Sequence, residues 1–99
     1  MRVIAKRTLR EFYEQPNRFD AQDALESWHK EAKAANWKNF GDVKQAFASA
    51  SGVGNNRIVF NIHGNKYRLI VKLNYPTGII YVRFVGTHSE YDQIDASTI

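Results

Sequence analysis

Cysteine is absent from this chain of 99 residues, and long hydrophobic runs are absent as well. Without cysteine there can be no disulfide bridges and no thiolate metal ligands. The opening stretch, MRVIAKRTLR, is apolar only briefly before charge returns, which is not the pattern of a signal peptide, and no later segment is long enough to cross a membrane. We therefore expect a cytoplasmic protein with no membrane partner, folded as one domain over residues 1–99.

Acidic side chains are absent from Val43 to Ser89, whereas basic ones are frequent there. The formal net charge of +4 hides this one-sided distribution. A surface of this kind suits a polyanion such as a nucleic acid. A plainer interpretation is that lysine and arginine only keep the exposed face of a sheet soluble and guard its edges, but an ordinary solvated face mixes both signs.

Several catalytic signatures are also absent. The sequence has no glycine-rich phosphate loop and no Gly-x-Ser-x-Gly motif, which argues against a P-loop enzyme and against a serine hydrolase. Residues 88–92 cluster possible metal ligands, but the acid-free segment before them offers no carboxylate to complete a magnesium site. The sequence therefore predicts neither a metal site nor a cofactor.

Three runs of alternating residues do stand out between Arg57 and Asp92, and they have the pattern of half-buried antiparallel strands. Gly64-Asn65 suits a two-residue hairpin turn between the first two runs, because glycine adopts positive φ freely and asparagine tolerates it. The pairs that this turn predicts are Asn61 with Arg68 and Val59 with Ile70.

A longer connection, residues 74–78, joins the second run to the third. We set its register so that the large apolar side chains share one face, since a slip of one residue would scatter them. The predicted pairs are Leu73 with Ile80, Val71 with Val82, Leu69 with Phe84 and Arg68 with Val85. The opposite face is then open and basic, and it carries Arg57, Asn61, His63, Lys66, Arg68, Lys72, Tyr81 and Arg83.

The chain before these runs is predicted to be mostly helical, after a short strand over residues 1–5 that lies beside the sheet. Thr8 and Glu11 match a capping box, and Pro16 ends the first helix. Asp20 is the expected cap of the second helix.

The second helix is the longest, because apolar residues recur at helical spacing from Ala21 to near Trp37, and Trp28 is expected to pack on the sheet. A third helix is predicted over about residues 42–50, and residues 49–56 read as a flexible loop. Together these elements predict a two-layer α+β domain, with helices on one face of an antiparallel meander sheet and the basic face open.

Metal-free RNA cleavage suits these residues. RNA carries its own nucleophile, the 2′-OH, so an enzyme needs a base for that proton, cations for the charged phosphorane and an acid for the leaving 5′-oxygen. Arg68 and His88 are expected to meet at one end of the basic face, with Tyr91 close by. Taken singly, His88 is better explained as a loop or helix-cap histidine, and Tyr91 as an aromatic that packs the last helical turn against the core.

Two linked stretches resemble a known family: FNIxGNxYRL at 60–69 and YVRFVGTHxEYD at 81–92. With the Trp-Lys-x-x-x-Asp-Val-Lys stretch at 37–44, they are similar to HigB toxins of type II toxin–antitoxin systems, in the RelE/ParE-like superfamily. The resemblance covers nearly the whole chain and implies a RelE-like fold. It also implies a ribosome-dependent mRNA endonuclease that blocks translation, with a HigA-type helix-turn-helix antitoxin that alone contacts operator DNA.

The resemblance assigns roles as well. Arg68, which follows an aromatic residue, matches a strand arginine that stabilises phosphate, while His88 matches a basic residue beyond the last strand and Tyr91 a tyrosine shortly after it. The paired lysines of RelE fall near Val59 and Asn61 in this sequence and are absent. The residues expected to bind RNA are Arg57, Asn61, His63, Lys66, Lys72 and Arg83.

Two other functions stay open. One is a non-catalytic toxin that resembles ParE, which acts on DNA gyrase. The other is a basic RNA-binding module without chemistry. The grouping of Arg68, His88 and Tyr91 at one end of a basic face favours the endonuclease.

Overall fold

The computed structural model describes all 99 residues and contains one five-stranded sheet in the order β1-β5-β4-β3-β2. Strand β1 runs parallel to β5, and the other neighbours are antiparallel. The α+β class and the N-terminal strand beside the main sheet were both predicted correctly. The elements are β1 (Arg2–Ile4), α1 (Lys6–Tyr13), the 3-10 helix η1 (Phe19–Ala21), α2 (Gln22–Ala34), α3 (Phe40–Ala46), β2 (Ser51–Gly54), β3 (Arg57–Ile62), β4 (Tyr67–Asn74), β5 (Ile79–Thr87) and α4 (His88–Tyr91).

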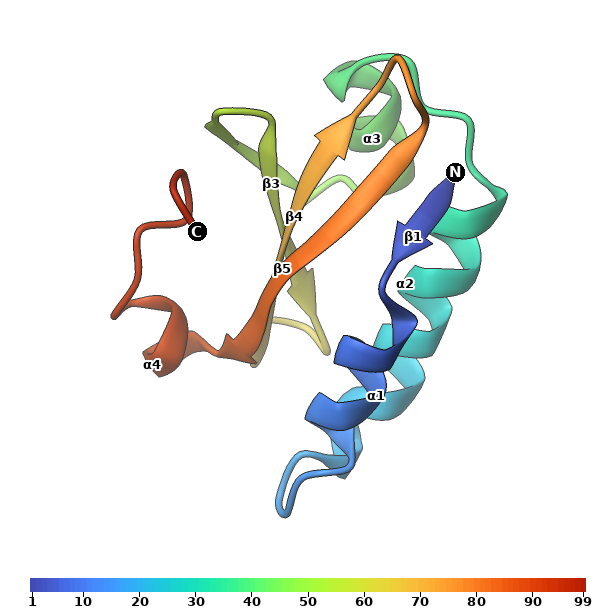
Figure 1. The fold of residues 1–99 in the computed structure, drawn as a ribbon. Coiled ribbons are helices and arrows are strands. Elements are labelled where there is room, and N and C mark those ends of the chain that lie inside the picture. The colour runs from blue at the N-terminus through green and yellow to red at the C-terminus, as the bar shows by residue number, and fades with distance from the viewer.

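The helices are divided between the two sides of the sheet. In Figure 1, α2 runs beside β1 and α1, whereas α4 and the C-terminal residues lie on the opposite side of the strands. Helix α2 buries Leu25, Trp28 and Ala32, which recur at the spacing of one helical face. No helix is both long enough and apolar enough to cross a membrane.

Aromatic side chains hold the helical layer on the sheet. The ring of Phe60 on β3 lies 5.4 Å from Trp28 and 5.1 Å from Phe47, measured between centroids. The ring of Trp37 stacks on Phe60 at 6.4 Å. Offset and edge-to-face pairs of this kind add to the free energy gained by burying the rings. The predicted packing of Trp28 on the sheet is therefore confirmed, and this packing fixes the sheet's inner face.

The first hairpin has the predicted register but a different turn. Asn61 pairs with Arg68 as expected. The loop runs over residues 63–66, and positive φ occurs at His63 and Gly64 rather than at Gly64 and Asn65. The register survives because a four-residue loop spanning His63 to Lys66 leaves the same residues opposite each other.

The second hairpin departs from prediction after its first half. Val71 pairs with Val82 as expected, but Ile70 pairs with Phe84, so Arg83 is an extra residue on β5. Such a bulge reverses which side chains of the bulged strand face the core. Val85, instead of Phe84, consequently pairs with Leu69 and packs against the core.

Two helix starts and one loop were also predicted wrongly. Helix α1 begins at Lys6 with Ala5 as its cap, because the chain leaves β1 directly into the helix, and Thr8 lies inside its first turn. Helix α3 is capped by the Asn39 side chain and ends at Ala46, short of the predicted end. Residues 51–54, expected to be loop, form strand β2 on the otherwise free edge of β3.

Candidate active site

Three of the predicted residues meet where β4 and β5 reach the same end of the sheet. Arg68 on β4 pairs with Gly86 on β5, and the main-chain N–H of His88 donates to the carbonyl of Lys66 at 3.2 Å. Helix α4 then folds back, so that the Arg68 guanidinium carbon lies 5.7 Å from the centre of the Tyr91 ring. The rings of His88 and Tyr91 are 6.4 Å apart.

The predicted pairing of Arg68 with Val85 was wrong, and the Arg83 bulge explains the shift to Gly86. A side chain at position 86 would meet the Phe84 ring at 2.5 Å and a Glu90 carboxylate oxygen at 3.1 Å. The missing Cβ therefore lets α4 approach the strand beside Arg68.

A capping box starts α4. The Thr87 hydroxyl accepts from the Glu90 N–H at 3.2 Å, and the Glu90 carboxylate accepts from the Thr87 N–H at 2.9 Å. Such reciprocal bonds fix the entry of a short helix. They orient His88, the first residue of α4, relative to the end of β5.

Asp92 completes the group, and sequence reasoning did not give it this role. Its Oδ2 lies 3.1 Å from Nδ1 of His88. A carboxylate at this position holds a proton on Nδ1 and leaves Nε2 free to accept another. Spacing of four residues on a helix was the available signal, since such residues share one face. We call Arg68, His88, Tyr91 and Asp92 the strand-end cluster.

Asp20 binds the two residues that precede Arg68 in the chain. Its carboxylate accepts from Lys66 Nζ and from the Tyr67 hydroxyl, both at 2.5 Å, while Nε2 of His63 lies 3.7 Å away. These hydrogen bonds from Lys66 and Tyr67 lower the pKa of Asp20. Burial, and then the bond to Asp20, raises the pKa of Tyr67.

The predicted role of Asp20 as a helix cap was therefore wrong. Ala21 is the cap of α2, and Asp20 belongs to η1, where its carboxylate reaches across to the β3–β4 hairpin. Two of the residues predicted to bind RNA, His63 and Lys66, face this acid.

A second acid also returns to this end of the sheet. Glu90 forms an ion pair with Arg18 at 3.1 Å, and the Thr87 N–H is the main cause of the lowered pKa of Glu90, with Arg18 contributing. The acid-free segment of the sequence is thus not free of acids in space, because acids from both sides of that segment fold onto it.

Most of the other predicted RNA-binding residues lie on the outer face, farther from the strand-end cluster. Arg57, Lys72 and Tyr81 pair across three strands, with Arg83 beside them at the bulge. We call these four residues the basic row. Asn61 lies nearer the strand-end cluster, half-buried and paired with Arg68.

The prediction that this basic face is open was wrong for the basic row, which the C-terminal segment partly covers. The main-chain oxygen of Ile99 accepts from Arg57 at 2.9 Å and from Arg83 at 3.3 Å. Asn55 donates to the oxygen of Ser97 at 2.9 Å. The C-terminal segment that follows α4 therefore lies against the two arginines and accepts from Nη2 of Arg57 and Nε of Arg83, an arrangement that alternation along the strands could not reveal.

Metal-ligand types are dispersed in this region. Imidazole and carboxylate side chains do not come together in a group of three or more that could hold a metal ion. Glu90 faces Thr87 and Arg18, while Asp92 faces His88, although the two acids are close in sequence.

Helices packed on a five-stranded, mostly antiparallel sheet make an α+β fold that is consistent with a RelE-like toxin. The family model HigB_toxin, described as the RelE-like toxic component of a toxin-antitoxin system, matches residues 21–94. The match spans well over half of the chain, so the chain belongs to the HigB toxin family. No curated protein matched the sequence. The protein is thus the toxin of a toxin–antitoxin system, and an antitoxin is its partner.

Proposed function

We propose that this toxin is an mRNA interferase, an endoribonuclease that cuts mRNA on the ribosome and so inhibits translation. The observation that carries the proposal is the strand-end cluster. In it the Arg68 guanidinium lies 5.7 Å from the centre of the Tyr91 ring, and the His88 imidazole, oriented by Asp92, lies 6.4 Å from the same ring. These are the groups that RNA cleavage by its own 2′-OH requires.

The reaction begins with the ribose. Nε2 of His88 takes the 2′-OH proton, and the 2′-oxygen attacks the adjacent phosphorus. Asp92 accepts the Nδ1–H of His88, which keeps the ring in the tautomer that can act as a base. The P–O5′ bond then breaks, and the leaving 5′-oxygen takes a proton from the Tyr91 hydroxyl. The products are a 2′,3′-cyclic phosphate and a 5′-hydroxyl, with no metal ion in the step.

Arg68 provides the charge that the transition state needs. Attack places additional negative charge on the phosphoryl oxygens, and a fixed guanidinium stabilises it better than mobile water does. The Tyr91 ring beneath the guanidinium and the Asn65 carbonyl, which accepts from Arg68 at 3.3 Å, hold that group in place. Preorganised positioning of this kind lowers the barrier without adding ground-state affinity.

The partners follow from the same proposal. The ribosome presents the mRNA, and Lys72 and the other basic residues of the outer face attract its phosphates. A HigA-type helix-turn-helix antitoxin neutralises the toxin by covering the strand-end cluster or by keeping the toxin off the ribosome. Contact with operator DNA is made only by the antitoxin.

Primer extension on mRNA after brief induction of the toxin tests the proposal, together with analysis of product ends from purified ribosomes. We expect discrete cuts within translated regions, 5′-hydroxyl ends and activity that persists when a polyamine replaces Mg²⁺. Ends with a 5′-phosphate would show a metal-activated water and contradict the mechanism. Intact mRNA with inhibited DNA gyrase would instead identify a toxin that acts as ParE does.

A further inference from the structure

Four basic side chains surround a hollow on the helical side of the molecule, far in the fold from α4. The hollow has a volume of about 530 Å³ and lies where β1, the start of α1 and the C-terminal half of α2 meet. We call it the basic hollow. Its lining residues are Met1, Arg2, Val3, Lys6, His29 and Lys33.

The charges of the basic hollow are not neutralised by carboxylates. None of Arg2, Lys6, His29 and Lys33 takes part in an ion pair, although six such pairs occur elsewhere in the protein. Burial, and then the charges of Lys6 and Lys33, lower the pKa of His29. Lys6 and Lys33 therefore place two positive charges close to this ring.

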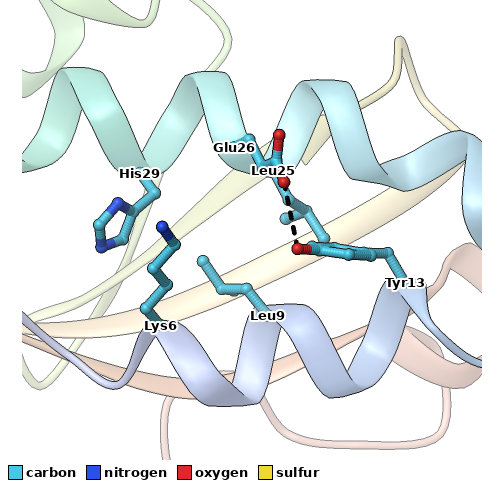
Figure 2. A pocket seen from close by; sticks show the side chains of 6 residues that line it. All are labelled: Lys6, Leu9, Tyr13, Leu25, Glu26 and His29. Carbon is cyan, nitrogen blue, oxygen red and sulfur yellow. Dashed lines mark hydrogen bonds between the residues drawn. The ribbon is translucent and has the colours of Figure 1, made fainter.

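Glu26, three residues before His29 on the same helix, does not line the hollow. Figure 2 shows its carboxylate directed at the Tyr13 hydroxyl, which donates to it at 3.1 Å, while Lys6 and His29 lie side by side. Gln22 donates to the same carboxylate oxygen at 3.1 Å. Because Glu26 is held by these neutral donors, Lys6 and His29 are left for an external anion.

We propose that the basic hollow binds phosphate groups of an RNA backbone, as a second RNA contact separate from the strand-end cluster. Lysine and arginine on several elements around a concave surface suit phosphates, which need charge and donors but no fixed base pattern. An acidic peptide fits less well, because protein interfaces have an apolar, often aromatic centre, and Met1 and Val3 are the only apolar residues lining the hollow.

This second contact would matter because of where it lies. Figure 1 shows α2 on one side of the strands and α4 on the other, and β1 is the edge strand of the sheet, so one RNA strand in the cluster does not fill the hollow. A toxin that touches folded RNA on both sides would be held in one orientation while the cluster acts. That the bound phosphates belong to RNA rests on the proposed function. That the hollow binds phosphate rests only on the side chains that line it.

The test compares two double charge reversals by fluorescence anisotropy with a labelled RNA hairpin. Lys6→Glu/Lys33→Glu removes the hollow's lysines, and Lys30→Glu/Lys38→Glu makes the same change in net charge at exposed lysines outside it. We expect the first variant to bind about tenfold more weakly than the second at moderate salt. We also expect its log–log salt slope to be smaller by about 1.5–2, as for two lost phosphate contacts. Equal affinities and slopes would overturn the proposal.

Imidazole NMR of the wild-type protein keeps the test independent of folding and of catalysis. Titration with the RNA hairpin, and separately with inorganic pyrophosphate, should shift the His29 ring signals. Unshifted His29 signals in both titrations would refute the site. Loss of antitoxin binding in Lys6→Glu/Lys33→Glu with unchanged RNA affinity would show an acidic protein partner instead. A toxin that binds RNA in the basic hollow but does not cleave it would contradict the proposed function and leave the phosphate site standing.

Discussion

At the strand-end cluster, cationic and aromatic side chains contact one another, whereas along the basic row the arginines contact main chain. Arg68 lies over Tyr91 and His88 binds Asp92. Arg57 and Arg83 instead donate to the oxygen of Ile99. Both regions belong to the outer face of one sheet and look alike in sequence. Catalysis requires groups that directional partners hold in a fixed position. Long-range attraction of phosphates requires only positive charge.

The largest effect is expected from removing the imidazole of the strand-end cluster. His88→Ala should lower the rate of RNA cleavage by about 10²–10⁴-fold, because it removes the group that takes the 2′-OH proton. Tyr91→Phe should lower the cleavage rate by a factor in the same range if the phenol protonates the leaving oxygen. Single-turnover cleavage on ribosomes measures both rates.

Lys72→Ala is the matched control on the basic row, where no side-chain partner fixes the ammonium. Its cleavage rate at saturating toxin should stay close to that of the wild type. A loss in Lys72→Ala as large as that in His88→Ala would mean that the two regions do not differ in function.

Arg68→Ala should lower the rate by about 10²-fold, comparable to the loss of one oxyanion donor. Ribosome affinity should change far less than rate, because the guanidinium acts mainly in the transition state. Sedimentation of toxin with ribosomes measures the affinity, and single-turnover cleavage measures the rate. A parallel loss of both would place Arg68 among ordinary phosphate contacts, and full activity would put the site at another end of the sheet.

Much of this contrast could be predicted from the sequence, because alternation and turn chemistry act locally. The pairing of Asn61 with Arg68 followed from one hairpin turn, and the approach of His88 to Arg68 followed from strand lengths. The Arg83 bulge could not be predicted. Apolar residues precede and follow Arg83, so the alternating pattern fits a strand with or without an extra residue at this position.

Long-range contacts account for the other errors. Asp20 has the local features of a helix cap, but its carboxylate gains more from Lys66 and Tyr67, residues far along the chain. The position of Ile99 beside Arg57 and Arg83 likewise depends on the path of the chain after α4. The periodicity of apolar residues and the secondary-structure propensities of the sequence carry no information on either contact.

Reversing charge in the basic row should have a moderate effect on binding. Lys72→Glu/Arg83→Glu should lower RNA affinity several-fold and reduce the salt slope by about one, because Lys72 is free to meet phosphate while Arg83 is engaged by Ile99. Anisotropy across a salt series measures both quantities. Most of the loss should appear in Lys72→Glu alone; unchanged binding in the double variant would remove the basic row from RNA recognition.

The smallest effect concerns stability and how it depends on pH. Because the Asp20 pKa is lowered below its ordinary value of 3.8 in the folded protein, the ionised carboxylate stabilises the fold at pH values above that point. This stabilisation is lost as pH falls through the lowered pKa, when the folded protein also protonates Asp20. Asp20→Asn should therefore lower the melting temperature near neutral pH and make little difference in strong acid.

Lys66 provides the control for that measurement. The Asp20 carboxylate accepts from Lys66 and from Tyr67, and the bond from Lys66 is the larger cause of the lowered pKa. In a Lys66→Met background, Asp20→Asn should thus cost less at neutral pH, and its pH dependence should flatten. Thermal unfolding of the four proteins from neutral to acidic pH measures the coupling. Equal costs in both backgrounds would show that Asp20 and Lys66 do not stabilise each other, and that Lys66 is as free to bind RNA as Lys72.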